Sequence, residues 1–305
     1  MRLISRLPGW VILAILAVIW GTSFILIKYG LKVFSPQQVG ALRISIAAIA
    51  FSPVFWARRK RIDWKKWRYL LVVGLFGSFI PALLFALAQT KINSTMAGIL
   101  NSLTPLFTLV LGILLFKRPF EGRKAAGVSI GLFGAVLLIA TGSQLGAGGD
   151  ALYGLLVVLA TMCYATSGNT VGAYLNTMNV LTISAVSYGL VGGPALILLL
   201  STDFLNAMQT HTGAWEALGY VSVLSLAGTF FASLLFFDLI QRTDAVFGSS
   251  IAYLIPIVAV MWGIADGEQI GWWHLAGMGL ILSGVYLTRS RTRKPKRAEG
   301  TDVDE

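Results

Sequence analysis

The chain has little charge for its length. Of its 305 residues, 12% are Asp, Glu, Lys or Arg, whereas 56% are hydrophobic, and the mean hydropathy is +0.77. Soluble domains carry about 25% charged residues and roughly 45–50% apolar ones. Because so few charges cannot give a globule of this size a hydrated surface, the composition excludes a soluble enzyme or binding module. It predicts an integral membrane protein.

Residues that ligate metals or carry out covalent chemistry are also scarce. Cys163 is the only cysteine, and His211 and His274 are the only histidines. The sequence can therefore form no intrachain disulfide and no cysteine zinc cluster, and it contains neither HExxH nor DDxxD. We expect no cofactor and no metal, and an intramembrane enzyme is a distant alternative.

Positive charge exceeds negative charge, with 24 Lys and Arg against 13 Asp and Glu and a formal net charge of +11. A basic chain can bind nucleic acid. Here, however, the basic residues stand in a few short stretches between apolar runs, and membrane topology with anionic lipid explains that placement. The expected partner is the lipid bilayer, and no nucleic-acid partner is expected.

Ten apolar runs are long enough to cross a bilayer, which takes roughly 20 mostly apolar residues. They fall at 10–31, 37–57, 67–89, 94–116, 123–142, 152–173, 180–201, 214–237, 246–264 and 271–289. The sequence therefore predicts an all-α integral membrane protein with ten transmembrane helices. Residues 290–305 are predicted to form a polar cytoplasmic tail.

Lysine and arginine are divided unevenly between the segments that connect these runs. If the N-terminus is cytoplasmic, all but four of the 24 lie on the cytoplasmic side; Lys28, Lys32 and Lys91 lie outside, and Arg43 lies within a helix. Because positive residues collect on the cytoplasmic side of membrane proteins, both termini are predicted to be cytoplasmic. The expected location is the bacterial inner (plasma) membrane.

The chain also repeats itself. The segments AGILNSLTPLFTLVLGILLF (97–116) and GSSIAYLIPIVAVMWGIADG (248–267) share a central proline, and WGTSF (20–24) resembles YATSG (164–168). Five helices per half is an odd number, so the halves 10–142 and 152–289 would enter the membrane from opposite sides. Such inverted five-helix repeats are typical of secondary transporters, which hold their substrate between the halves.

Four stretches carry a resemblance to a known family: WGTSFILIKYGL (20–31), SPQQVGALRISIAA (35–48), 86–116 and 253–287. The chain resembles the drug/metabolite transporter (DMT) superfamily, in its EamA-type branch with two tandem domains. The family usually has Gly-Glu after the proline-containing helix of each half. Gly267-Glu268 matches this pattern, whereas the first half has Phe116-Lys117 at the place taken as equivalent.

The resemblance implies ten helices, cytoplasmic termini and transport of small organic metabolites, with efflux of amino acids or related solutes frequent in such proteins. A flippase for lipids or lipid-linked carriers is the nearest alternative. No Asp or Glu lies at the middle of an apolar run, which favours uniport or exchange, while a proton path through Asp238 stays open.

Two basic residues inside apolar runs are candidates for substrate binding, because a charge at mid-bilayer costs at least about 2.5–3.5 kcal/mol. Arg43 could bind a substrate carboxylate or phosphate, or it could be structural. Lys28 could snorkel to the outer surface. If Lys28 and Arg43 face one cavity, they form a cationic vestibule that favours anionic or zwitterionic solutes.

Polar and aromatic residues supply the other candidates. Trp20 and Tyr164 lie at mid-helix, away from the interfacial belts, and could stack on a substrate. Small polar neighbours could bind it or only allow close packing. The remaining predicted substrate-binding residues are Thr22, Ser23, Gln89, Asn101, Asn169, Tyr188 and Tyr253.

Proline and glycine predict features of the packing. Pro105 and Pro256 are expected to kink their helices, and Pro105 leaves the carbonyl of residue 101 without its helical donor. Gly127 and Gly131 form GxxxG, and Gly277 belongs to a similar small face. These faces could pack the two halves together or support a homodimer.

Overall fold

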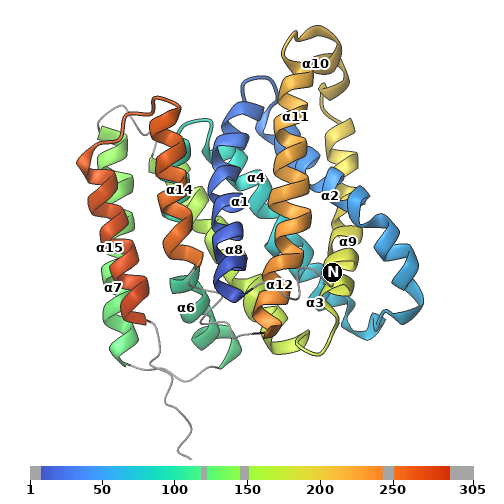
Figure 1. Ribbon diagram of the computed structural model, residues 1–305, viewed down its shortest axis with the longest axis horizontal. Helices are drawn as coiled ribbons and strands as arrows, with labels where there is room; N and C mark the ends of the chain where they lie inside the picture. Colours follow the sequence, from blue (N-terminus) through green and yellow to red (C-terminus); the bar gives the residue numbers. More distant parts are fainter. Residues whose placement is uncertain (1–7, 118–121, 145–150, 243–250, 289–305) are drawn as a thin grey trace, which may run out of the picture.

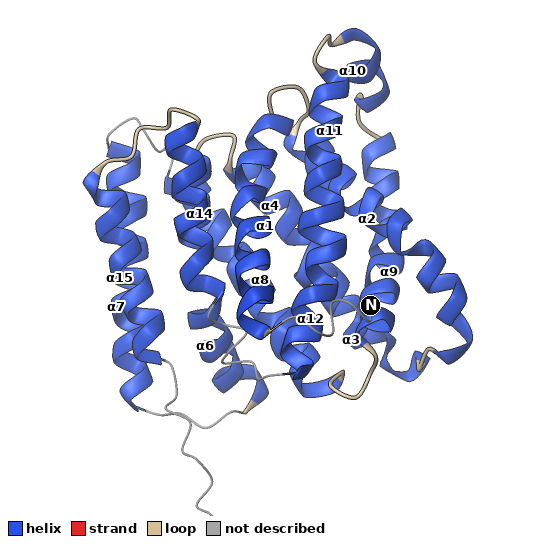
Figure 2. Ribbon diagram, viewed as in Figure 1, coloured by secondary structure: helices blue, strands red, loops and turns tan. Residues whose placement is uncertain are grey.

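The computed structural model describes the chain except for residues 1–7, 118–121, 145–150, 243–250 and 289–305, so the predicted tail lies outside the described residues. In the described part the secondary structure is helical and no strand is present (Figure 2). The long helices stand side by side with their axes close to one direction (Figure 1). The prediction of an all-α protein is therefore confirmed.

The described helices follow one another with short connections. They are α1 (Gly9–Gly30), α2 (Pro36–Arg58), η2 (Arg59–Arg61), η3 (Trp64–Lys66), α3 (Trp67–Gly74), η4 (Leu75–Phe79), α4 (Ile80–Ala88), α5 (Ser94–Asn101), α6 (Thr104–Phe116), α7 (Gly122–Gln144), α8 (Ala151–Tyr174), α9 (Val180–Leu200), α10 (Phe204–Thr210), α11 (Ala214–Ser225), η5 (Leu226–Phe231), α12 (Ala232–Arg242), α14 (Ile251–Ala265) and α15 (Trp272–Thr288).

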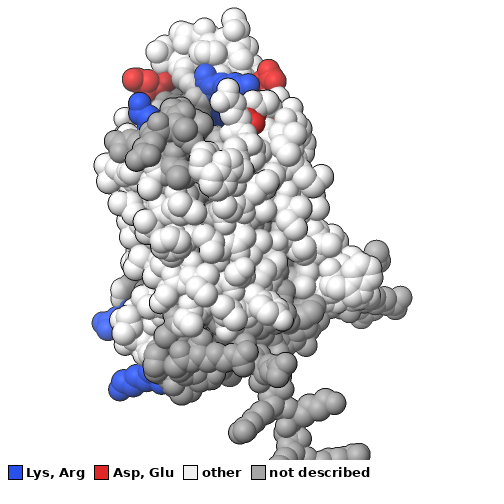
Figure 3. All heavy atoms as spheres, turned by 90° about the vertical axis from the view of Figure 1, so that its left-hand side faces the viewer, with Lys and Arg blue, Asp and Glu red and all other residues white. Residues whose placement is uncertain are grey.

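Seven helical segments are long and apolar enough to cross a membrane, and three shorter apolar helices accompany them within the described ranges. The seven are Gly9–Gly30, Pro36–Arg58, Trp64–Ala88, Ser94–Phe116, Ala151–Tyr174, Val180–Leu200 and Ala214–Phe236. On the face drawn in Figure 3, basic side chains lie near both ends and acidic ones near the upper end, and a broad uncharged band separates the two ends. Length, composition and charge placement fit a multi-pass membrane protein.

Local capping explains why several helices begin where the sequence predicts. Ser35 accepts a hydrogen bond from the Gln38 backbone N–H, and the Gln38 side chain accepts one from the Ser35 backbone N–H. Pro36 follows at the first helical position, where no amide donor is needed. Asn93 and Asn179 cap α5 and α9 in a similar way. The predicted start of the second run, residue 37, is one residue from Pro36, the first residue of α2.

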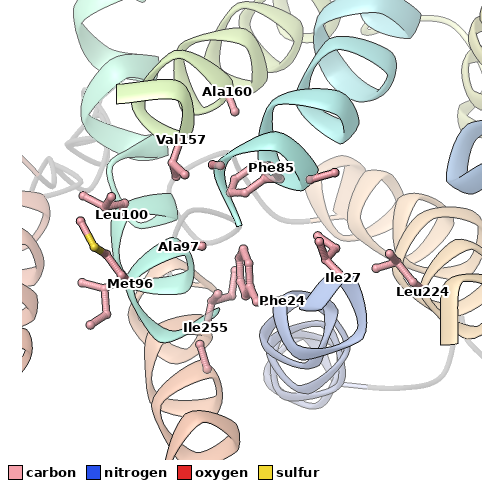
Figure 4. Packing of buried hydrophobic residues seen from close by; sticks show 14 of the residues in the cluster. Phe24, Ile27, Phe85, Met96, Ala97, Leu100, Val157, Ala160, Leu224 and Ile255 are labelled. Atoms are coloured by element: carbon pink, nitrogen blue, oxygen red, sulfur yellow. The ribbon is translucent and has the colours of Figure 1, made fainter. Parts of the chain in front are cut away.

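One large apolar core joins residues that are far apart in the sequence. Figure 4 shows Phe24 of α1 beside Phe85 of α4, with Met96, Val157 and Ile255 in the same cluster. All five are buried, and the Phe24 and Phe85 ring centroids are 5.7 Å apart. Side chains from both halves of the sequence therefore form a single packed interior.

Two π-helical segments interrupt long helices at similar motifs. Segment η4 carries LFGSF and segment η5 begins LAGTF, so both contain Leu-x-Gly-[Ser/Thr]-Phe. A π-turn adds one residue to a helix and is frequent at functional sites. The sequence analysis predicted continuous helices here and did not predict these turns.

The predicted proline kinks have different local structures. Helix α5 ends at Asn101, and α6 starts at Thr104 with Pro105 in its first turn, so the chain is interrupted between them. The carbonyl of Asn101 accepts a hydrogen bond of 2.8 Å from Thr104 Oγ1. This hydroxyl replaces the amide donor that proline lacks. Pro256, by contrast, lies inside the uninterrupted helix α14.

The chain takes a positive φ after α6 and again after α14. Gly267 has φ of +74°, and Lys117 has φ of +55° directly after α6. Lys117 thus takes a left-handed conformation directly after α6, and Gly267 takes one two residues after the end of α14. Glycine adopts such a conformation without strain, whereas lysine does so at a cost.

The glycine-rich faces of α7 and α15 pack against each other within the chain. A methyl group on Gly284 would lie 2.5 Å from both the Gly127 carbonyl oxygen and the Gly131 nitrogen. A methyl group on Gly134 would lie 3.1 Å from the Gly277 carbonyl oxygen. The small faces thus bring helices of the two halves together. The homodimer stays a prediction, and it would have to use other surfaces of these helices.

We expect Gly284→Ala to destabilise the protein, because the methyl group meets backbone atoms of α7 that cannot move independently. Overpacking of this kind costs roughly 1–3 kcal/mol. The matched control is Gly279→Ala on the same helix, where a methyl group meets nothing within 4 Å. We expect no loss there, since alanine favours helix over glycine by roughly 0.5–1 kcal/mol. Thermal unfolding in detergent checks both, and equal melting temperatures would contradict the close approach of α7 and α15.

Candidate functional site

Arg43 lies in the middle part of α2 and contacts the π-helical segment η5. Its Nε donates to Thr229 Oγ1 at 2.9 Å, and its carbonyl oxygen accepts from Ser225 Oγ at 2.6 Å. These two bonds fix both the backbone and the guanidinium of Arg43 against the second half of the chain. Among the described residues, no carboxylate forms an ion pair with Arg43.

Two tyrosine hydroxyls complete the surroundings of this guanidinium. Ser78 Oγ, in η4, donates to the Tyr188 hydroxyl oxygen at 2.8 Å. Tyr188 is buried on α9, and its ring stacks on Phe51 of α2 with centroids 5.0 Å apart. Tyr164 and Tyr188 both lie close enough to Arg43 to interact with it electrostatically.

We call Arg43, Ser78, Tyr164, Tyr188 and Thr229 the central polar cluster. Its members come from α2, η4, α8, α9 and η5, so both halves of the sequence contribute. Each π-helical segment supplies one hydroxyl that holds a larger polar side chain. The cluster combines one cation with four hydroxyl groups, a set suited to binding an anionic group.

Glycines allow the π-helical segments to approach two serines closely. A methyl group on Gly228 would lie 2.8 Å from Ser23 Oγ, and one on Gly77 would clash with Ser167 Oγ. Trp20 Nε1 donates to the Gly228 carbonyl oxygen at 3.0 Å. Ser23 and Ser167 occupy equivalent places in WGTSF and YATSG. The predicted residues Trp20 and Ser23 therefore support η5 from one side.

The aromatic residues expected to stack on a substrate pack on protein rings in this structure. Trp20 meets Phe236 edge-on with centroids 5.1 Å apart, and Tyr164 stacks on Phe85 at 6.0 Å. Thr22 accepts a hydrogen bond of 2.8 Å from Trp262 Nε1, and Trp262 is 42% exposed. Thr22 thus faces α14 and the periphery of the bundle, away from the central polar cluster.

Among the amide candidates, Gln89 and Asn169 are buried and Asn101 is half-buried, and several of their polar atoms have no hydrogen-bond partner. Both side-chain polar atoms of Gln89 and the Oδ1 atoms of Asn101 and Asn169 are in this position. Asn169 Nδ2 donates to the Thr108 carbonyl oxygen at 2.9 Å, which joins α8 to α6. Tyr253 is half-buried and packs against the main core.

Lys28 does not share a vestibule with Arg43. Its Nζ lies 2.5 Å from Asp266 Oδ2 and 2.7 Å from Glu268 Oε1, just after α14. The lysine expected to snorkel, or to line a vestibule with Arg43, is therefore neutralised by two carboxylates. Gly267 turns the chain after α14 and brings Glu268 toward α1 and α5.

Glu268 also caps α5. Its two oxygens accept hydrogen bonds from the backbone N–H groups of Ser94 and Thr95 at 3.1 Å and from their hydroxyls at 2.7 Å. Tyr29 donates to Asp266 at 2.5 Å. We call these six residues the Glu268 network: Lys28, Tyr29, Ser94, Thr95, Asp266 and Glu268. It joins two helices of the first half to the segment after α14.

The charges in this network shift the pKa values of its carboxyl groups. Burial raises the pKa of Glu268, but hydrogen bonds from Lys28, Ser94 and Thr95 outweigh burial and leave it below its ordinary value of 4.5. For Asp266, burial likewise acts upward, and hydrogen bonds from Lys28 and Tyr29 bring the pKa below 3.8. Both groups are therefore stabilised as carboxylates.

Sequence reasoning missed Ser78 and Thr229 as site residues and did not pair Asp266 or Glu268 with Lys28. The repeated motif Leu-x-Gly-[Ser/Thr]-Phe at 75–79 and 226–230 was a usable signal for the first two. For the carboxylates there was no local signal, because their partner lies more than two hundred residues away in the sequence.

Comparisons with known proteins address the transporter interpretation. The model of the EamA-like transporter family matches residues 8–140 and 152–290. An "uncharacterized transporter" of Archaeoglobus fulgidus is 28% identical over 91% of this chain and 97% of its own length. A "probable amino-acid metabolite efflux pump" of Salmonella typhimurium is 26% identical over 97% of this chain and all of its own.

Two further comparisons concern location and fold. An "uncharacterized inner membrane transporter", YedA, of Escherichia coli K12 is 26% identical and covers 94% of this chain and 92% of its own. A solved crystal structure with 18% identity superposes with a TM-score of 0.58 over 92% of this chain and 95% of that chain. This last similarity concerns the fold alone.

These findings confirm the predicted family resemblance, and they confirm the prediction that the chain is a transporter and not an enzyme. The family match covers most of the chain in two tandem parts, and the named relatives are transporters or efflux pumps. The apolar helices agree with a multi-pass membrane protein. The chain belongs to the EamA-like transporter family.

Proposed function

We propose that the protein exports small organic metabolites, amino acids or related solutes, by alternating access. The carrier consists of ten transmembrane helices in two inverted five-helix halves, residues 10–142 and 152–289. The substrate site lies between the halves at the central polar cluster. The name of the Salmonella typhimurium relative supports both the solute class and the direction.

The pair of π-helical segments is the observation that carries this proposal. Each lies within the third helix of its proposed half, each has the same motif, and each holds a polar residue of the central polar cluster. Inverted repeats place equivalent elements on opposite sides of one substrate site. The two hydroxyls, on Ser78 and Thr229, occupy such equivalent places.

Packing between helices of the two proposed halves supports rocking of one half against the other. Helix α2 packs on α9, α7 packs on α15, and α1 and α6 contact α14 and α8. In the proposed order of ten, these pairs join the second helix to the seventh, the fifth to the tenth, the first to the ninth and the fourth to the sixth. Most of the tight helix pairs therefore join the halves, where relative motion would change access to the site.

We place the end that carries the Glu268 network and α10 outside the cell and the Arg58–Lys66 end in the cytoplasm. The uneven division of Lys and Arg supports this orientation, with both termini cytoplasmic in a bacterial inner membrane. The Glu268 network then closes the outer end. Opening that end requires Lys28 to leave its two carboxylates.

Metabolite profiling tests the export proposal. Bacteria that carry the intact protein or an empty vector are compared for solutes in the medium and in cell extracts, with the amount of protein in the membrane measured in parallel. We expect a small set of amino-acid-like solutes to accumulate outside only with the protein. If the medium does not change, export is wrong, and import or a lipid-type cargo becomes the better description.

A reversible cross-link tests alternating access. In a Cys163→Ala background, Thr95→Cys and Gly263→Cys would join α5 to α14, since a Cβ on Gly263 lies 3.3 Å from the Cβ of Thr95. Oxidation should stop export, and a reductant should restore it. Each single-cysteine variant is the control. Full export by the oxidised double variant would exclude opening between α5 and α14.

A further inference from the structure

Arg43 is a cation in a membrane-spanning helix, and no carboxylate among the described residues forms an ion pair with it. Both ion pairs of the described residues belong to Lys28. A charge held within a bilayer is costly, and buried charges in proteins are normally paired. Thr229 and the nearby tyrosines give Arg43 hydroxyl groups and no negative charge. The missing charge can therefore be brought by a ligand.

The geometry leaves one edge of the guanidinium for that ligand. Nε donates to Thr229 Oγ1, and the Tyr164 hydroxyl interacts with one further N–H of the guanidinium, so both terminal nitrogens keep an N–H donor for a ligand. Two parallel donors on a planar group match the two oxygens of a carboxylate. Ser225 holds the Arg43 backbone carbonyl at the same time, so the position of the fork relative to η5 is fixed.

A hydroxyl from the opposite half can donate to the same ligand. Ser78 donates to the Tyr188 oxygen, which leaves the Tyr188 proton for a further acceptor. Tyr188 is buried, and it lies near Arg43. A ligand held by both Arg43 and Tyr188 would bridge the two halves.

The number of positive charges decides between kinds of anion. Among the described cations, only Arg43 lies close enough to the hydroxyls of Tyr164 and Tyr188 to interact with them electrostatically. Lys28, the other basic residue predicted to bind substrate, lies in the last turn of α1 and is neutralised by Asp266 and Glu268. One positive charge balances a monoanion, whereas a phosphate dianion would leave a negative charge in a low-dielectric site.

We propose that the central polar cluster binds one carboxylate group of the transported solute, with Arg43 as the binding residue and Thr229 as the residue that positions it. This inference rests on the proposed function and adds the chemical group by which the solute is recognised. The rest of the solute extends away from the fork.

Binding to the purified full-length protein tests the inference without transport. The probes are acetate, the natural amino acids, the carboxamide of each, and inorganic phosphate, measured by thermal shift and calorimetry in detergent. We expect one or more carboxylates to bind, the matched carboxamides to bind at least about 30-fold more weakly, and phosphate not to bind. Equal binding of acids and amides, preferred binding of phosphate, or no binding by any carboxylate would overturn the proposal.

Variants of Arg43 and Thr229 test separately the positive charge, the bidentate geometry of the guanidinium and its positioning by Thr229. Arg43→Gln should weaken the best carboxylate at least about 30-fold, and Arg43→Lys should restore only part of that loss because it keeps the charge without the fork. Thr229→Val should weaken binding about fivefold, with recovery in Thr229→Ser. Lys91→Gln, which removes an exposed charge, should change nothing. Unchanged acid-to-amide selectivity in Arg43→Gln would overturn the assignment.

The binding measurements and the export measurements can fail independently of each other. Selective carboxylate binding without export would retain this site and reject the proposed direction. Export without carboxylate selectivity would retain the carrier and reject the role of Arg43.

Discussion

Replacing Arg43 with methionine is expected to abolish export and at the same time to stabilise the protein. Methionine fills a similar volume and removes an uncompensated charge, whose cost in a membrane helix is at least about 2.5–3.5 kcal/mol. The hydrogen bond to Thr229 is lost, which costs about 1 kcal/mol. We therefore expect a net gain of roughly 1.5–2.5 kcal/mol, measured as a higher melting temperature, together with export at the level of the empty vector.

Arg58→Met provides the matched control on the same helix. Arg58 donates to Asn179 Oδ1 at 2.9 Å at the end of α2. It follows Arg43 by fifteen residues, which is roughly 22 Å along a helix. Its loss should leave export unchanged and lower stability slightly. If Arg43→Met exports normally and melts at a lower temperature, Arg43 is a structural residue and the carboxylate site is wrong.

Replacing Glu268 with glutamine is expected to produce the largest loss of stability of any single change at the outer end. The side chain keeps its shape, but its carboxamide presents a donor where the Thr95 N–H and hydroxyl also donate, and it leaves Lys28 with one carboxylate. Removing one partner of a buried ion pair costs about 3–5 kcal/mol. Because Lys28 is partly exposed and keeps Asp266, we expect the free energy of unfolding to fall by about 3 kcal/mol.

Glu216→Gln is the control, since Glu216 is exposed and has one bond, from the Tyr220 hydroxyl. Its melting temperature should match that of the intact protein, and a similar fall in both variants would refute the special role of Glu268.

Acid should weaken the Glu268 network in the intact protein. The pKa values of Glu268 and Asp266 are lowered by folding, so the carboxylates stabilise the folded state fully above about pH 4.5. That contribution is lost as pH falls from there through the lowered pKa values. The melting temperature of the intact protein should therefore fall more steeply below pH 4.5 than that of Glu268→Gln. Parallel curves would show that Glu268 does not contribute to acid sensitivity.

The sequence determined the helical membrane fold because that information is local. Runs of about 20 apolar residues can satisfy their backbone hydrogen bonds in a bilayer only as helices, since a strand would need a closed barrel. Capping residues such as Ser35 then set the first residue of a helix. This is why the predicted range 180–201 and the observed helix Val180–Leu200 differ by one residue.

The sequence also singled out Arg43, because a charge within an apolar run is visible without any structure. It could not identify what Arg43 contacts. Thr229 is 186 residues away, and only the packing of α2 against η5 brings the two together. The same limit applied to Lys28, which was expected to snorkel or to line a vestibule with Arg43, and whose ion pairs with Asp266 and Glu268 were not predicted.

Tertiary structure alone decided the course of the backbone at the two π-helical segments and at Lys117. Helical periodicity does not distinguish an α-turn from a π-turn that adds one residue, and lysine has no preference for a positive φ. What selects these conformations is contact with other helices, such as Gly77 against Ser167 and Gly228 against Ser23. The sequence by itself therefore determined that the chain is helical and apolar enough to cross a membrane several times, while the packing of the two halves decided which side chains meet. Helix formation depends on neighbours in the chain, whereas a binding site depends on neighbours in space.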